Sequence, residues 1–104
     1  MIARAWHGRV PLHKGEDYLD FLKKRAVPDY EGTPGNRGVF ILRRVENGEA
    51  HFLLITLWES REAIRAFAGD DIERARYYPE DSGFLLELEP RVSHYEVAAS
   101  PEPA

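Results

Sequence analysis

The sequence predicts one α+β domain of the ferredoxin-like type, in which an antiparallel sheet carries both helices on one face. Three observations predict this class. Strand and helix patterns follow one another along the chain in the order βαββαβ. Right-handed crossovers then give the spatial strand order fourth, first, third, second. The length of 104 residues suits one hydrophobic core, which we assign to residues 1–98, with residues 99–104 as a frayed tail.

The first strand and the first helix occupy the N-terminal part of the chain. Residues 2–10 have a strand pattern, and Pro11 ends the strand because proline lacks the N–H that a ladder needs. Apolar residues recur at helical spacing over residues 14–27 and predict a helix there. Pro28 sets its end, since the residue before a proline avoids helical backbone angles.

A hairpin is expected in the middle of the chain. Residues 30–38 contain three glycines and a proline and predict a loop. Strands are expected over residues 39–45 and 51–58. The intervening residues 46–49 contain Asn-Gly, which tolerates the positive φ angles of a tight turn.

The second helix is expected to begin after Ser60, a good N-cap, and to stop at Gly69. A further short helix is expected over residues 70–78. Residues 80–90 fit either a short helical turn or a packed loop. The last strand is expected over residues 91–97.

The composition disfavours several kinds of partner. The net charge of −4 disfavours binding to nucleic acid or to an anionic membrane surface. No apolar run approaches the roughly 20 residues that span a bilayer, and the N-terminus has no signal-peptide pattern. The absence of cysteine excludes disulfides and thiolate chemistry. We therefore expect a cytoplasmic protein without nucleic-acid or membrane partners.

Both faces of the sheet have apolar residues, although helices cover only one face. On the third strand, one face is Phe52, Leu54, Thr56 and Trp58, and the other is His51, Leu53, Ile55 and Leu57. An exposed apolar sheet face is an association site. We therefore expect a homodimer through the open sheet face; alternatively, the C-terminal segment folds over that face.

Three segments resemble one known family. They are Leu57-Trp58-Glu59-Ser60-Arg61-Glu62-Ala63, Pro34-Gly35-Asn36-Arg37-Gly38 and His94-Tyr95-Glu96-Val97. The first is similar to the signature of the antibiotic biosynthesis monooxygenase-like superfamily, the second to its Pro-Gly loop and the third to its closing strand. The resemblance covers residues 1–98. It implies a dimeric α/β barrel with a pocket between each sheet and its helices.

The resemblance leaves the activity open, because the family includes cofactor-free oxygenases, haem-degrading enzymes and members of no known function. Polyketide-oxidising relatives place an Asn upstream of the signature Trp, where this chain has Leu54 and Thr56. Haem-degrading relatives carry a His and a second Trp, where this chain has Tyr77 and Phe67. These departures disfavour polyketide oxidation and haem degradation.

The aromatic candidates are Trp6, Trp58, Phe67, Tyr77 and Tyr78. On the family pattern Trp58 lines the pocket, where it would stack on a flat aromatic substrate; alternatively it is a core residue at the strand–helix junction. Tyr77 and Tyr78 follow the second helix, and their phenols would line the mouth of the pocket. We take Trp58 and Tyr77 as catalytic candidates, and the other three as substrate-binding candidates.

His7 is the third catalytic candidate. It faces the opposite side of the first strand from Trp6 and is expected near Arg91, Ser93 or His94. A His with a pKa near neutrality suits proton abstraction from a phenol; alternatively it is a hydrogen-bonded structural residue. A metal site would need a third ligand, and none is suitably spaced, so we expect no metal.

Arg43 and Arg44 are also substrate-binding candidates. They lie in the middle of a strand, where an inward charge must be paired or must bind an anion. They would fix a substrate carboxylate or phenolate, or instead form ion pairs with Glu49, Glu59 or another acid.

These observations favour a cofactor-independent monooxygenase that oxidises a small aromatic or phenolic compound with O₂. His7 or a Tyr would deprotonate the substrate, and Trp58 would stack on it. The alternatives are a non-catalytic dimeric protein for small-ligand binding or stress response and, less favoured, a haem-binding or haem-degrading protein.

Overall fold

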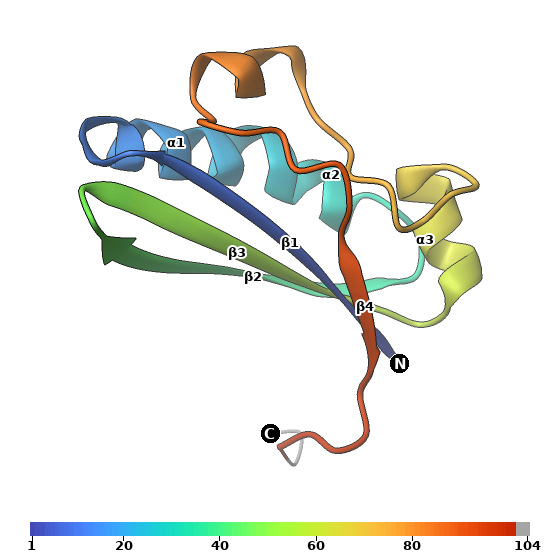
Figure 1. The fold of residues 1–104 in the computed structure, drawn as a ribbon. Helices are drawn as coiled ribbons and strands as arrows, with labels where there is room; N and C mark the ends of the chain where they lie inside the picture. The colour runs from blue at the N-terminus through green and yellow to red at the C-terminus, as the bar shows by residue number, and fades with distance from the viewer. Residues whose placement is uncertain (102–104) are drawn as a thin grey trace.

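The computed structural model describes residues 1–101; the end of the predicted tail, residues 102–104, lies outside the described residues. Four strands form one sheet: β1 (Ile2–Pro11), β2 (Asn36–Glu46), β3 (Glu49–Trp58) and β4 (Ser93–Glu96). Their spatial order is β2-β3-β1-β4, and all neighbours are antiparallel. The predicted ferredoxin-like α+β fold is thereby confirmed, with the helices on one side of the sheet (Figure 1).

The first helix is longer than predicted. Four segments form one continuous helical stretch: η1 (Leu12–Lys14), α1 (Gly15–Phe21), η2 (Leu22–Ala26) and α2 (Val27–Glu31). The predicted end at Val27 is wrong, because Pro28 lies in the first turn of α2. The Val27 N–H donates to the Leu22 carbonyl five residues back. This wider π-helical turn accommodates a proline that would clash in a regular α-helix.

The central hairpin forms as predicted. Its turn residues Asn47 and Gly48 have φ angles of 53° and 72°, the positive values of the tight turn that joins two antiparallel strands. Both strands extend closer to this turn than the sequence indicated.

The junction between β3 and α3 (Arg61–Ala68) is held from two sides. The Ser60 hydroxyl accepts the Ala63 N–H at 3.2 Å, so the predicted N-cap is present. The Gly35 carbonyl accepts the Glu59 N–H at 2.9 Å. Gly35 has a φ of 91°, and a Cβ there would lie only 2.5 Å from the Ala63 Cβ. The Pro-Gly loop and the start of α3 therefore require a glycine facing an alanine.

The segment between α3 and β4 differs from the prediction. Residues 70–78 do not form a helix; Arg74 instead makes an isolated antiparallel bridge to Arg91. The Val92 N–H donates to the Glu73 carbonyl, and the Ala75 N–H to the Pro90 carbonyl. This pairing satisfies the backbone in an extended form. A short 3₁₀ helix, η3 (Pro79–Gly83), follows, and the last strand begins at Ser93 rather than at residue 91.

The two faces of the sheet differ in burial. Alternate residues of β1 and β3, from Arg4 to Val10 and from Ala50 to Trp58, are buried on the helical face. On the other face Phe40, Leu42 and Tyr95 remain 55%, 48% and 61% exposed. The segment from α3 to β4 runs on the helical side (Figure 1), so it does not cover the open face as the alternative prediction required.

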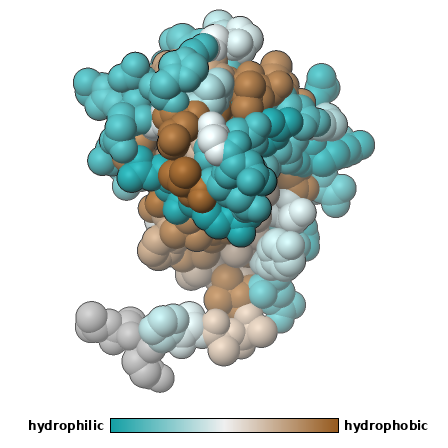
Figure 2. All heavy atoms as spheres, turned by 60° about the vertical axis from the view of Figure 1, so that its left-hand side comes forward, coloured by the Kyte–Doolittle hydropathy of each residue, from teal (hydrophilic) through white to brown (hydrophobic). Residues whose placement is uncertain are grey.

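In Figure 2 hydrophobic residues reach the surface in patches between hydrophilic ones in the upper half of the view, and again in its lower half, the half in which the sheet lies in Figure 1. None of the helices within residues 1–101 has the length and apolar character needed to cross a membrane.

We predict that Ser60→Ala lowers the free energy of unfolding by about 1 kcal/mol, because it removes the side-chain acceptor at the start of α3. Denaturant titration of the purified protein measures this. Ser100→Ala, at an exposed position outside helices and strands, should be neutral. Equal stability of the two variants would show that the cap contributes nothing.

Candidate functional site

The predicted site residues lie in two places. Trp6, Trp58, Phe67, Tyr77 and Tyr78 lie on the helical side of the sheet, within or against the core. His7 and Arg44 line a hollow at the other face. Arg43 also borders this hollow, but it pairs with Phe52 in the sheet and its side chain reaches Glu16 of α1 on the helical side. The sheet separates the two groups, so the residues predicted to act together on one substrate do not form one site.

Trp58 packs as a core residue. It has no exposed surface, and its Nε1 donates to the Thr56 hydroxyl at 2.8 Å. Its ring lies 5.9 Å from that of Phe67 and 6.4 Å from that of Tyr30. The signature Trp therefore supports the aromatic layer beneath the helices and presents no face to solvent.

A cavity of about 20 Å³ lies between the sheet, the first helix and the segment after α3. This volume accommodates about one water molecule. The lining residues are Trp6, Tyr18, Leu22, Ala26, Tyr30, Leu54, Arg76, Tyr78 and Asp81. The position that the family resemblance gave to a pocket is therefore nearly filled, and aromatic and ionisable side chains surround the space that remains.

Asp81 is the buried acid of this cavity, with 3% of its surface exposed. Its carboxylate accepts the Tyr18 hydroxyl at 2.8 Å and the Tyr78 N–H at 2.7 Å. Burial raises the pKa of Asp81, and the two hydrogen bonds oppose this. Burial and the nearby Asp81 raise the pKa of Tyr18. The pair is thus a neutral phenol that donates to a desolvated carboxyl group.

Arg76 and Tyr78 form the outer wall of the cavity. The Arg76 guanidinium carbon lies 4.5 Å from the centre of the Phe67 ring and 5.5 Å from that of Tyr78. The Tyr78 hydroxyl donates to Asp29 at 2.7 Å, and Arg76 Nη2 lies 3.7 Å from the same carboxylate. Burial, then the hydrogen bond to Asp29, raise the pKa of Tyr78.

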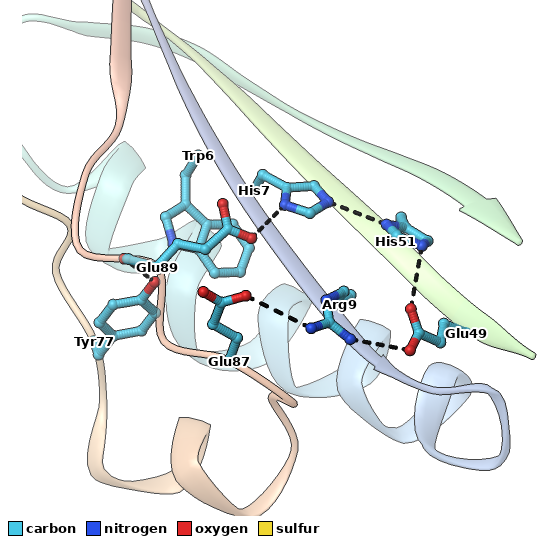
Figure 3. Close-up of polar contacts among 8 residues, drawn as sticks. All are labelled: Trp6, His7, Arg9, Glu49, His51, Tyr77, Glu87 and Glu89. Carbon is cyan, nitrogen blue, oxygen red and sulfur yellow. Dashed lines mark hydrogen bonds and ion pairs between the residues drawn. The ribbon is translucent and has the colours of Figure 1, made fainter. Parts of the chain in front are cut away.

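Trp6 and Tyr77 are joined by a hydrogen bond at the edge of β1. Trp6 Nε1 donates to the Tyr77 hydroxyl at 3.3 Å, and that hydroxyl donates to the Glu89 carbonyl at 2.5 Å. Burial raises the pKa of Tyr77. Glu89 lies between the two faces: its backbone holds Tyr77, and its carboxylate reaches His7 (Figure 3).

The outer hollow has a volume of about 340 Å³ and is lined by His7, Leu42, Arg43, Arg44, His51 and Leu53. His7 Nδ1 lies 2.6 Å from the Glu89 carboxylate, and His7 Nε2 lies 3.2 Å from His51 Nδ1. The predicted neighbours of His7 at positions 91, 93 and 94 are replaced by Glu89 and His51, because the segment before β4 runs along β1 and the Leu86 N–H donates to the Arg9 carbonyl.

Charges around this hollow are paired. His51 Nε2 lies 3.5 Å from Glu49, which also binds Arg9 at 3.0 Å (Figure 3). Arg43 pairs with Glu16 at 2.6 Å, and Arg44 with Glu46 at 2.8 Å. The arginines thus follow the ion-pair alternative, with partners other than the two acids named from sequence. Within residues 1–101, no group of three or more potential ligands is placed to hold a metal ion.

Sequence reasoning missed Tyr18, Arg4, Arg76 and Asp81. The sequence contained one signal for Asp81. This residue stands three positions after Tyr78, where an acidic side chain accepts the N-cap N–H at the start of a helix. The burial of Arg4 and the approach of Arg76 to Phe67 depend on the extended path of residues 70–78, which the sequence pattern did not indicate.

Comparison with models of known protein families gives a match over most of the chain. The model of the antibiotic biosynthesis monooxygenase family matches residues 3–74. Among curated proteins, none matches this chain significantly.

Solved structures share the fold over nearly the whole chain. The heme-degrader MhuD from Mycobacterium tuberculosis, with two hemes bound in its active site, is 24% identical with a TM-score of 0.66, over 97% of this chain and 99% of that one. A putative antibiotic biosynthesis monooxygenase from Bacillus cereus is 15% identical with a TM-score of 0.62, over 98% and 97%. A point mutant of MhuD, with two manganese protoporphyrin IX bound per active site, is 23% identical with a TM-score of 0.65, over 99% and 100%.

We predict that Asp81→Asn changes the pH dependence of stability. A raised pKa means that the folded state holds this proton more tightly than the unfolded state, whose reference value is 3.8. Its stabilising contribution is present below that pH and is lost as pH rises through the folded-state pKa. The stability of the variant relative to the wild type should therefore rise from pH 4 to 7, by about 1.4 kcal/mol per pKa unit of difference.

Denaturant titrations at several pH values measure this change. Asp70→Asn, at an exposed aspartate, is the control and should follow the wild type. If the curves of wild type and Asp81→Asn stay parallel, the carboxyl group is not desolvated.

Proposed function

Because the chain belongs to the antibiotic biosynthesis monooxygenase family, we propose that it oxidises a small phenolic compound with O₂, without a cofactor, in the cavity between the sheet and the helices. The observation that carries this proposal is the buried Asp81 carboxyl group among the aromatic side chains of that cavity. A desolvated carboxylate is a stronger base than one in water, which suits proton abstraction from a phenol.

The proposal assigns proton abstraction to Asp81 rather than to His7. His7 faces the outer hollow and has its Nδ1 on Glu89. Asp81 lines the inner cavity, where it accepts the Tyr18 hydroxyl. A substrate hydroxyl would take the place of that phenol, and the rings of Trp6 and Tyr30 would flank the substrate. Trp58 would support this wall from behind, through Tyr30 and Phe67.

The reaction needs no external reductant, because the substrate supplies the electrons. Deprotonation by Asp81 gives a phenolate, which passes one electron to O₂. The two radicals combine at a ring carbon that bears hydrogen. The O–O bond then breaks, so that one oxygen atom stays as a quinone carbonyl. The other leaves as water with the two hydrogens of the substrate. Asp81 regains its resting state when its proton goes to that water.

Substrate entry requires the cavity to widen, since its 20 Å³ does not accommodate an aromatic ring. The wall that would move is the segment from Gly69 to Val92. It contains one short 3₁₀ helix, and its backbone otherwise makes isolated hydrogen bonds. The hydrogen bonds from Tyr18 to Asp81 and from Tyr78 to Asp29 would have to break when it moves. Segments with few backbone hydrogen bonds open at low free-energy cost.

The proposal includes a homodimer through the open face of the sheet. Phe40, Leu42 and Tyr95 lie on this face with about half of their surface exposed. The paired strands add Ile55 and Leu57 beside them. A contiguous apolar face of this kind favours association of two copies about a two-fold axis.

Haem binding is the second candidate function, and the fold likeness to the heme-degrader MhuD favours it. Against it, the inner cavity is nearly filled, and the Tyr77 hydroxyl is already bonded to Trp6 and Glu89. A haem would have to displace the whole aromatic wall and find an iron ligand such as a tyrosinate.

Oxygen uptake tests the proposed reaction. With 1-naphthol as substrate, the wild type should consume O₂, and Asp81→Asn should lower the rate by about 10²-fold or more, as loss of a general base does. His7→Gln should retain most of the rate, and the reverse order would assign the base to His7. A ligand-induced rise in melting temperature without uptake would instead indicate a non-catalytic binding protein, and a Soret shift on adding haem would indicate haem binding.

Light scattering at micromolar concentration tests the dimer. We expect the mass of two chains for the wild type and of one chain for Phe40→Lys, because the lysine would place a charge within the apolar interface. Val45→Lys is a matched control: Val45 is on the same strand and 57% exposed, compared with 55% for Phe40, but faces the other side of the sheet. A monomeric wild type would contradict the dimer.

A further inference from the structure

Arg4 is a buried cation without an acidic partner. It lies on the helical face of β1, and 1% of its surface is exposed. Its Nη2 donates to the Arg74 carbonyl at 3.1 Å, while its Nε is buried without any hydrogen-bond partner. Among residues 1–101, none of the ion pairs includes Arg4.

An unpaired buried arginine lowers the stability of the folded protein. An arginine stays charged even when buried, and a charge taken out of water without a counter-ion is unfavourable unless something else compensates it. Burial lowers the pKa of Arg4; Tyr30 opposes that shift, and Arg76 adds to it to a smaller extent. One carbonyl, the Tyr30 side chain and the face of Phe67, whose ring centre lies 5.7 Å away, are the partners that the chain provides, and none of them is an acid.

Other unpaired or positive groups gather around Arg4. Arg76 approaches the same Phe67 ring, at 4.5 Å from its centre. Tyr30 stacks on Phe67 at 4.3 Å, and burial raises the pKa of Tyr30 while Arg4 and Arg76 oppose that rise. His94 stands opposite Arg4 in the sheet, and both of its ring nitrogens are buried without a partner.

These groups adjoin the cavity described above. Tyr30 and Arg76 line one part of it, and Arg4 acts on Tyr30 from the sheet side. The acid nearest to Arg76 is Asp29, at 3.7 Å, and that carboxylate already accepts the Tyr78 hydroxyl. Asp81, the buried acid of the same cavity, accepts the Tyr18 hydroxyl and the Tyr78 N–H. The lining therefore combines the positive charge of Arg76 with a separate proton acceptor, and Arg4 adds its charge from behind Tyr30.

We infer that the ligand of this cavity is an aromatic carboxylate, bound with its carboxylate against Arg76 and the Tyr30 hydroxyl, within the field of Arg4, and with its phenolic hydroxyl directed to Asp81. This inference rests on the proposed function for the location of the site and narrows its substrate class from phenols to hydroxylated aromatic acids. Arg76 contacts the ligand, and Arg4 is a positioning residue that acts through Tyr30.

Two probes that differ only in the carboxylate test the inference. 1-Hydroxy-2-naphthoate and 1-naphthol share the ring system and the hydroxyl. Binding is measured without O₂, by calorimetry and by quenching of Trp6 and Trp58 fluorescence, so that no turnover is required. The acid should bind at least about tenfold more tightly than the naphthol, as expected for a hydrogen bond to a charged group.

Three variants test which arginine causes the tighter binding of the acid. Arg76→Gln and Arg4→Met should each reduce it to less than about threefold. Arg65→Gln, at an exposed arginine on α3, should keep it. Without ligand, Arg4→Met should melt at the same or a higher temperature than the wild type, because replacing an unpaired buried charge with an apolar side chain of similar length removes a cost.

Equal binding of the two probes would overturn the inference. It would also be overturned if Arg4→Met lowered the melting temperature and kept the preference for the acid, since Arg4 would then be only structural. If Arg4→Met did not fold, Arg76→Gln alone would decide. Preferential binding of the acid without O₂ uptake in air would leave this inference standing and contradict the oxygenase proposal.

Discussion

The alternation of side chains along β1 and β3 decides which chemistry each face of the sheet holds. Neighbours in a strand point to opposite faces, so Trp6 is directed to the helices and His7 to the open face. The same rule places Arg4 and Trp58 under the helices. Every assignment of a role in this protein depends on that separation, because a sheet one residue thick prevents a residue on one face from acting on a ligand bound at the other.

The helical face combines a packed aromatic layer with two ionisable groups in unusual surroundings. Trp58, Tyr30 and Phe67 fill the space beneath α3 and fix the wall of the small cavity. Asp81 and Arg4 are almost completely buried there. Packing alone would be served by apolar residues at both positions. A binding role explains why a buried acid lines the cavity and why a buried cation lies behind its Tyr30 wall.

The strands, the hairpin and the start of α3 were predictable because local signals and the global fold agree. The two-residue alternation of apolar side chains predicts the strands. Asn47-Gly48 predicts the turn of the hairpin, and Ser60 predicts the start of α3. The helix through Pro28 was not predictable. Local sequence rules predict that a helix ends before a proline, whereas here a π-helical turn avoids the clash with the proline ring. The extended path of residues 70–78 depends on pairing with residues 90–92, a contact between distant segments. The site residues Asp81 and Arg76 lie on or next to this segment, so their convergence was hidden for the same reason.

The most direct test of this account is a crystal structure of the protein with 1-hydroxy-2-naphthoate bound in the absence of O₂. The account predicts the ring between the sheet and the helices, with the hydroxyl on Asp81 and the carboxylate against Arg76. The segment after α3 would be displaced outward. Density for the compound in the outer hollow, against His7 and Arg44 with Asp81 still bonded to Tyr18, would contradict it.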